Sequence, residues 1–213
     1  MRSASEIDAV TVDAFGTAVL LEDPVEALRT ALARRGVERA REEVAAAFRA
    51  EVSYYRPRSL RGRDGPSLAQ LRRECVGIFL DALGADVDRD EFVPAFMDAL
   101  VFRPAEGAKD ALETLAAAGL ELACVANWDV SLREQLDRAG LAHLFRTVLS
   151  SAEAGAEKPH PQIFRLALAE LEVAPERALH VGDEPADAEG ARAAGLAFEP
   201  APLATLPTRL GLS

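Results

Sequence analysis

Two hydrophobic patterns alternate along most of this chain. Short, continuous apolar runs are typical of strands buried on both faces of a parallel sheet, and helical spacing fills the segments between the later runs. The runs predicted to form strands are 7–12, 120–126, 147–149, 178–181 and 196–198. The helices predicted between them are 106–118, 131–139, 161–172 and 186–194. Repeated units of this kind predict a three-layer α/β fold, with right-handed crossovers and helices on both faces of the sheet.

The stretch from Pro24 to about Leu100 follows a different pattern. Val25, Leu28 and Leu32 begin a series of apolar residues at helical spacing, and no convincing strand interrupts it. We therefore predict an all-helical domain inserted after the first strand. The predicted domains are a core of residues 1–20 and 104–213 and a helical domain of residues 21–103.

Composition narrows the classes of partner. The chain has 24 basic and 35 acidic residues, a net charge of −11, which argues against a nucleic-acid partner. No apolar run is long enough to cross a bilayer, and residues 1–8 lack the hydrophobic segment of a secretory signal, so we expect a cytoplasmic protein without a membrane partner. Cys75 and Cys124 lie far apart in sequence and are expected to be reduced thiols.

Polar side chains collect where the predicted strands end. In an open parallel sheet, ligands bind beyond the carboxyl ends of the strands, so these side chains are expected to meet there. Three acids at such a place predict a hard divalent cation, and Mg²⁺ is the cofactor that we expect. The candidate residues are Asp13, Thr17, Asn127, Lys158, Asp183 and Asp187.

Simpler interpretations exist for each of these residues. Asp13 and Asp183 could stabilise turns, Asp187 could cap a helix, and Lys158 could be a solvated loop cation. Lys158 is, however, one of only two lysines, and a compact ammonium reaches between carboxylates where a planar guanidinium fits poorly. His180 is interpreted as a buried core residue of a strand. The other histidines, His143 and His160, lack metal-ligand spacing, so zinc is not expected.

Four segments, in this order, resemble the motifs of the haloacid dehalogenase superfamily of aspartate-nucleophile hydrolases. They are Asp13-Ala-Phe-Gly-Thr17, Ala126-Asn127-Trp128-Asp129, Glu157-Lys158-Pro159 and Gly182-Asp183-Glu184-Pro185-Ala186-Asp187. The resemblance covers the whole chain, because the helical insert resembles that family's helical, C1-type cap. It implies a Rossmann-like core.

The resemblance also implies a role for each residue. Asp13 would be the nucleophile that forms a covalent intermediate, and Thr17 would orient it. Lys158 would neutralise charge between Asp13 and the substrate, and Asn127 would face the transferring group. Asp13, the backbone carbonyl of Phe15, Asp183 and Asp187 would hold Mg²⁺, with Asp187 a direct or indirect ligand. The implied reaction is hydrolysis of a small phosphorylated metabolite through an aspartyl-phosphate.

Two positions depart from the pattern of the family's phosphatases. Phe15 stands where those enzymes usually have a second aspartate, and losing a general acid costs roughly 10²–10⁴ in rate. Ala126 stands where a serine or threonine is usual. An aromatic residue at the position of Phe15 resembles the first motif of metal-independent 2-haloacid dehalogenases. In the fourth motif, however, Asp183 and Asp187 keep the metal-binding form. The alternatives to a Mg²⁺-dependent phosphohydrolase are therefore such a dehalogenase or a catalytically degenerate binding module.

An arginine cluster in the helical domain offers a candidate recognition element. Arg56, Arg58, Arg61 and Arg63 could form a solvated surface, or Arg56 and Arg58 could bind an anionic part of the substrate through bidentate hydrogen bonds.

Trp128 could line the site or belong to the core. The expected partner is a small-molecule substrate, and the chain is expected to be a monomer or a homodimer.

Overall fold

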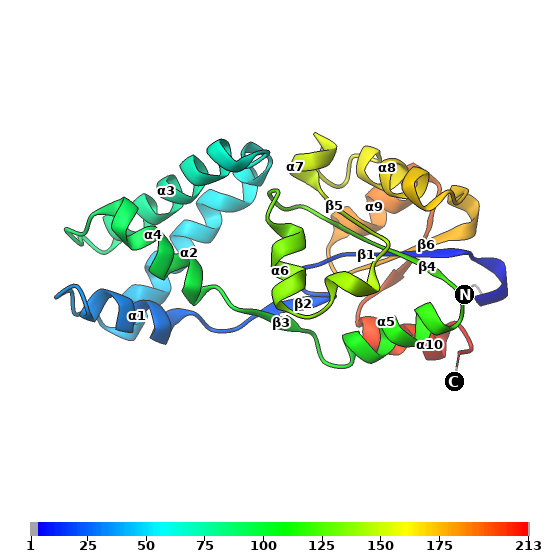
Figure 1. The fold of residues 1–213 in the computed structure, drawn as a ribbon, viewed down its shortest axis with the longest axis horizontal. Coiled ribbons are helices and arrows are strands. Elements are labelled where there is room, and N and C mark those ends of the chain that lie inside the picture. The colour runs from blue at the N-terminus through cyan, green and yellow to red at the C-terminus, as the bar shows by residue number, and fades with distance from the viewer. Residues whose placement is uncertain (1–3, 213) are drawn as a thin grey trace. The chain divides into compact units, whose positions relative to one another are not determined.

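Five parallel strands form the central sheet, in the order β5-β4-β1-β6-β7 (Figure 1). The strands are β1 (Ala9–Val12), β4 (Glu121–Ala126), β5 (Thr147–Ser150), β6 (Ala178–Gly182) and β7 (Ala197–Pro200). Because β1 pairs with β4 on one side and with β6 on the other, the residue that follows β1 leaves the middle of the sheet. The parallel sheet confirms the predicted α/β fold class.

Helices cover both faces of this sheet. Val10 and Val12 of β1 pack in one apolar cluster with residues of α5 (Ala108–Ala117), α6 (Leu132–Arg138) and α10 (Leu206–Arg209). Ala9 packs in a second cluster with α8 (Gln162–Leu171) and α9 (Pro185–Ala194). Successive residues of a strand point to opposite faces, so one short apolar strand contributes to both layers.

The structure, a computed structural model, describes residues 4–212; residues 1–3 and 213, which the predicted core domain includes, lie outside it. The chain divides into two compact units. The sheet unit comprises Met1–Leu20 and Phe102–Ser213, and the helical unit comprises Leu21–Val101.

Four α-helices build the helical unit: α1 (Val25–Ala33), α2 (Arg41–Tyr55), α3 (Gly65–Ala82) and α4 (Arg89–Ala99). Asp64 and Asp88 cap α3 and α4 by accepting hydrogen bonds from the backbone N–H groups of Ser67 and Glu91. The core of this unit includes Phe79 stacked on Phe92 with ring centroids 6.0 Å apart.

Several short elements were not predicted from the sequence. Strands β2 (Val19–Leu21) and β3 (Phe102–Pro104) pair as a separate two-stranded sheet. Helix α7 (Ser151–Ala154) follows β5, and α10 lies in the C-terminal segment. These elements are too short for a hydrophobic period to reveal them. The 3₁₀ helices are Ala4–Glu6, Arg56–Arg61, Ala142–Leu144, Pro175–Arg177 and Leu203–Thr205.

Cys75 and Cys124 are both buried, and neither forms a disulfide bond. Among the residues that the structure describes, no helix combines the length and the apolar character needed to cross a membrane.

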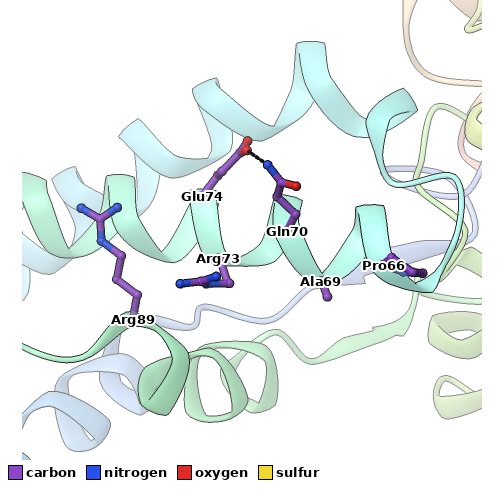
Figure 2. Close-up of a pocket in the computed structure, with 6 residues that line it drawn as sticks. All are labelled: Pro66, Ala69, Gln70, Arg73, Glu74 and Arg89. Atoms are coloured by element: carbon purple, nitrogen blue, oxygen red, sulfur yellow. Dashed lines mark hydrogen bonds between the residues drawn. The ribbon is translucent and has the colours of Figure 1, made fainter.

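A surface pocket of about 550 Å³ lies on the helical unit, lined by residues of α3 together with Arg89 (Figure 2). Its polar groups already have partners: Gln70 donates a hydrogen bond to Glu74, Arg73 pairs with Asp90, and Arg89 pairs with Asp81. The pocket contains none of the predicted site residues.

Candidate active site

The candidate nucleophile lies directly beyond the central strand of the sheet. Asp13 follows β1, is buried, and donates its backbone N–H to the carbonyl of Val181 at 2.9 Å. The chain then turns at Gly16, whose φ of 88° is costly for a residue with a side chain. A Cβ on Gly16 would lie 2.3 Å from Oδ2 of Asp183. Glycine therefore permits both the turn and the close approach of a second carboxylate.

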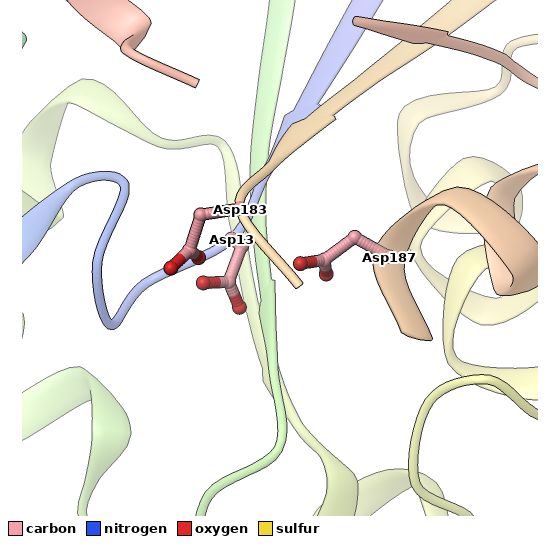
Figure 3. Close-up of side chains that lie close together, drawn as sticks. All are labelled: Asp13, Asp183 and Asp187. Atoms are coloured by element: carbon pink, nitrogen blue, oxygen red, sulfur yellow. The ribbon is translucent and has the colours of Figure 1, made fainter. Parts of the chain in front are cut away.

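Two further acids follow the neighbouring strand β6. Asp183 comes directly after Gly182, and Asp187 lies in the first turn of α9. Asp13, Asp183 and Asp187 each offer a carboxylate oxygen, and these oxygens lie within 4.8 Å of one another (Figure 3). A Cβ on Gly182 would lie 2.4 Å from Cγ of Asp187, so this glycine lets the Asp187 side chain lie against the strand.

Lys158 provides the positive charge of the cluster. Its Nζ lies 2.5 Å from Oδ1 of Asp13, 2.5 Å from Oδ1 of Asp187 and 3.2 Å from the carbonyl oxygen of Val125. These three acceptors match the three donors of an ammonium group. The side-chain amide of Asn127 holds the backbone of Lys158 from both sides: it accepts from the Lys158 N–H at 2.7 Å and donates to its carbonyl at 3.0 Å.

The electrostatics of the cluster follow from burial and from its crowded charges. Burial raises the pKa of Asp13 to about 7; the negative charges of Asp187 and Asp183 add to the rise, and Lys158 opposes it. Burial also works to raise the pKa of Asp187, but the hydrogen bond from His180 and the charge of Lys158 outweigh it and lower that pKa. Burial alone would lower the pKa of Lys158, yet its two carboxylate partners raise it.

The donor set fits a divalent cation. When all three carboxylates are ionised, the single ammonium leaves two negative charges without compensation in this cluster. Asp183 is exposed, and its Oδ1 accepts a hydrogen bond of 3.2 Å from the Thr17 hydroxyl. Carboxylate oxygens are hard ligands of the kind that Mg²⁺ prefers, and this ion commonly takes only one or two of them together with water and phosphate oxygens. Asp13, Asp183 and Asp187 are the residues that could hold such an ion.

Other predicted residues have contacts that the sequence did not indicate. The Thr17 hydroxyl donates to Asp183 rather than to Asp13. Trp128 is buried in the core of the sheet unit, where its ring meets Phe102 edge-on at 5.0 Å. Phe15 is 40% exposed, and its ring also meets the Phe102 ring edge-on, with the ring centroids 6.5 Å apart.

The predicted arginines lie in the helical unit, on and beside the 3₁₀ helix 56–61. Arg58 stacks on Tyr54, with its guanidinium carbon 4.0 Å from the ring centroid, and donates to the Tyr54 carbonyl. Arg61 forms a bidentate pair with Glu74 at 2.7 and 2.9 Å. Arg56 is exposed.

Two buried residues behind the acids had no functional role predicted from the sequence. His180 is fully buried, as predicted, but its Nε2 also lies 3.1 Å from Oδ1 of Asp187. Its Nδ1 lies 2.9 Å from the hydroxyl of Thr11 on β1. The signal in the sequence was a polar residue inside an otherwise apolar strand. Here that residue, His180, not only packs in the core but also contacts an acid of the candidate site.

A family model of haloacid dehalogenase-like hydrolases matches residues 7–195 of this chain. The chain belongs to this family of hydrolases. Its fold agrees with the structure of an L-2-haloacid dehalogenase from Xanthobacter autotrophicus, described with chloropropionic acid covalently bound. That structure has a TM-score of 0.67 and 27% sequence identity, covering 90% of this chain and 76% of the other.

Curated relatives in the family have different activities. A phosphoserine phosphatase of Thermus thermophilus is 52% identical over 80 residues, which are 37% of this chain and 32% of that protein. An (S)-2-haloacid dehalogenase of Pseudomonas sp. strain CBS-3 is 27% identical over 189 residues, 88% of this chain and 80% of that protein. The match with the phosphatase is therefore stronger but spans only about a third of the relative's length.

Proposed function

We propose that this hydrolase is a Mg²⁺-dependent phosphohydrolase that acts on a small phosphorylated metabolite through an aspartyl-phosphate. The observation that carries the proposal is the cluster of Asp13, Asp183 and Asp187 with Lys158 buried between two of them. One lysine leaves this acidic cluster short of positive charge, and a divalent cation would supply it. The phosphatase among the relatives supports the same assignment.

Each chemical step then uses a residue of this chain. A carboxylate oxygen of Asp13 attacks the phosphorus, and the bond from phosphorus to the leaving-group oxygen breaks with its electron pair on that oxygen. Lys158 donates a hydrogen bond to Oδ1 of Asp13, so we expect Oδ2 to be the attacking oxygen. A water oxygen next attacks the phosphorus of the aspartyl-phosphate, which releases inorganic phosphate and restores the Asp13 carboxylate. Mg²⁺, when bound by Asp13 and Asp183, supplies positive charge to the phosphoryl oxygens.

Phe15 limits the substrates that this chemistry can process. Its side chain has no proton to donate, so the leaving oxygen must depart as an anion or take a proton from water. We therefore expect good leaving groups, as in acyl and aryl phosphates, to react faster than alkyl esters.

A 2-haloacid hydrolase is the second candidate, and Phe15 together with the dehalogenase relatives favours it. In that reaction, a carboxylate oxygen of Asp13 would displace halide from the carbon of the substrate, and halide needs no proton to leave.

One set of assays separates these functions. Acetyl phosphate, p-nitrophenyl phosphate and a panel of phosphorylated metabolites are tested with Mg²⁺ and with EDTA, and 2-chloropropionate is tested for halide release. Phosphate release that requires Mg²⁺ and is lost in Asp13→Asn supports the proposal. Halide release in EDTA would establish the second candidate instead. A protein that binds ligands but turns over none of these compounds would be a binding module.

Arg56 and Arg58 are proposed to recognise an anionic group of the substrate. Replacing both with alanine should raise KM about tenfold with little change in kcat, since a hydrogen bond to a charged group contributes about 1.5–3 kcal/mol. Arg61→Ala is the matched control, because Arg61 pairs with Glu74. An unchanged KM in the double variant would remove this part of the proposal.

A further inference from the structure

Two polar residues lie side by side beneath the carboxylate cluster. Thr11 and His180 are register partners on the parallel strands β1 and β6, and both are fully buried. The hydroxyl of Thr11 lies 2.9 Å from Nδ1 of His180, and Nε2 of His180 lies 3.1 Å from Oδ1 of Asp187. A continuous chain of contacts thus runs from the interior of the sheet through Asp187 and Lys158 to Asp13.

The surroundings of the two ring nitrogens indicate where the His180 proton lies. Nε2 faces the Asp187 carboxylate, which accepts hydrogen bonds when ionised. Nδ1 lies 2.9 Å from the Thr11 hydroxyl, which can donate to it in preference to the Leu179 carbonyl at 3.4 Å. Nδ1 also lies 3.0 Å from the Thr11 carbonyl, which can only accept. A carboxylate is a stronger acceptor than a backbone carbonyl, so the proton belongs on Nε2, with Nδ1 accepting from the Thr11 hydroxyl.

With this tautomer, the hydrogen bonds of Asp187 fix its carboxylate in one orientation. Its Oδ1 accepts from His180 and from Lys158, while its Oδ2 accepts from the backbone N–H of Glu184 at 3.0 Å. Without the His180 donor, the carboxylate could rotate about χ2 and carry Oδ1 away from the ammonium. Lys158 would then lose one of the two carboxylates that hold it beside the nucleophile.

We propose that His180, oriented by Thr11, is a positioning residue that holds Asp187 and through it sets the place of Lys158 beside Asp13. The consequence for catalysis rests on the proposed function, whereas the arrangement of hydrogen bonds does not. The competing explanation is packing alone, because the His180 ring also meets Phe164 edge-on with centroids 4.9 Å apart.

Two pairs of variants separate positioning from packing. His180→Gln keeps an N–H donor close to the place of Nε2, whereas His180→Leu keeps the bulk and removes the donor. Thr11→Ser keeps the hydroxyl, whereas Thr11→Val keeps the shape and removes it. Circular dichroism and thermal unfolding establish that each variant is folded before it is compared.

Mg²⁺ affinity, measured by isothermal titration calorimetry with the metal alone, is the first measurement. Residues that orient a metal site typically cost 10–100-fold in affinity or activity when replaced. We expect Mg²⁺ binding to weaken about tenfold or more in His180→Leu, less in Thr11→Val, and to remain close to wild type in His180→Gln and Thr11→Ser. With p-nitrophenyl phosphate, the same order is expected for the fall in kcat, with KM little changed.

The second measurement needs no activity. The sequence has three histidines, so ¹⁵N-edited imidazole spectra of the wild type and of His180→Gln identify the His180 signals by difference. We expect the Nε2–H tautomer in the wild type and a shift of its signals in Thr11→Val.

The results distinguish failure of this inference from failure of the proposed function. A wild-type protein without Mg²⁺ binding or phosphatase activity contradicts the proposed function, and the imidazole spectra still decide the inference. An Nδ1–H tautomer, with its proton donated to the Thr11 carbonyl, would overturn the inference. So would a folded His180→Leu variant that binds Mg²⁺ and turns over substrate as the wild type does.

Discussion

Each unit of this protein buries a carboxylate, but the two carboxylates have different neighbours. Asp13 in the sheet unit and Glu51 on α2 of the helical unit are both buried, and burial raises the pKa of each to about 7. Asp13 lies among Lys158, Asp183 and Asp187, whereas the contact that works against burial at Glu51 is a hydrogen bond with Cys75.

This contrast shows that a raised pKa alone does not identify a catalytic acid. Desolvation acts on any carboxylate inside a fold. What distinguishes Asp13 is its position at the end of the central strand and the convergence of other charged groups on it. Burial of Glu51 costs folding free energy, and no group of charged side chains like that around Asp13 is described at Glu51. We therefore expect Glu51 to affect stability rather than turnover.

The largest effect should appear when Asp13 and Glu51 are each replaced, in separate variants, by the corresponding amide. Asp13→Asn removes the nucleophile and should lower kcat at least about a thousandfold. Glu51→Gln should leave kcat close to wild type. Both are measured with p-nitrophenyl phosphate and Mg²⁺. Comparable losses in the two variants would contradict the distinction between the two buried acids.

The two lysines of the chain offer a second matched pair. Lys158→Met leaves Asp13 and Asp187 buried without their shared cation, and breaking a buried pair in this way costs about 3–5 kcal/mol of unfolding free energy. Lys109 lies on the exposed face of α5, 3.9 Å from Glu113, and Lys109→Met should cost less than about 0.5 kcal/mol. Urea unfolding at neutral pH measures both, and equal losses would show that Lys158 does not compensate the acids.

Two glycines with positive φ, one in each unit, allow the same comparison to be made for the backbone. Gly16 has φ 88° and Gly36 has φ 77°, so alanine should cost each site about 1–2 kcal/mol through backbone strain. A Cβ on Gly16 would also collide with the Asp183 carboxylate, whereas nothing lies within 4 Å of a Cβ on Gly36. We expect Gly16→Ala to lose activity and Mg²⁺ affinity while Gly36→Ala keeps both. Kinetics and calorimetry on the two variants test this.

A further effect concerns the stability of the fold and its dependence on pH. The pKa of Glu51 is about 7 in the folded chain against an ordinary value of 4.5. At pH values between 4.5 and about 7, the Glu51 carboxyl group holds a proton in the folded state that it has released in the unfolded state. The free energy of unfolding therefore falls as pH rises through this range. A tenfold difference in proton affinity between the two states corresponds to about 1.4 kcal/mol, so Glu51→Gln should gain about 2–3 kcal/mol over wild type on going from pH 5 to pH 8. Urea unfolding at both pH values measures this gain, and a constant difference would contradict a raised pKa.

Much of the fold follows from the sequence because its signals are local. Buried parallel strands require continuous apolar runs, and helices require apolar residues at helical spacing, so the sheet and its covering helices could be predicted. Asp13, Asp183 and Asp187 could be placed together because parallel strands end at one edge of a sheet. The structure brings their oxygens within 4.8 Å of one another.

Tertiary structure alone decided the partners of these side chains. Lys158 meets Asp13 across 145 positions of sequence, and Thr11 meets His180 across 169. Such contacts depend on strand order and on crossovers, which leave no local periodicity. Thr17 therefore pairs with Asp183 rather than with Asp13, a contact that was not predicted. The sequence determined which chemical groups are available at the strand ends, and packing in three dimensions determined which of them touch.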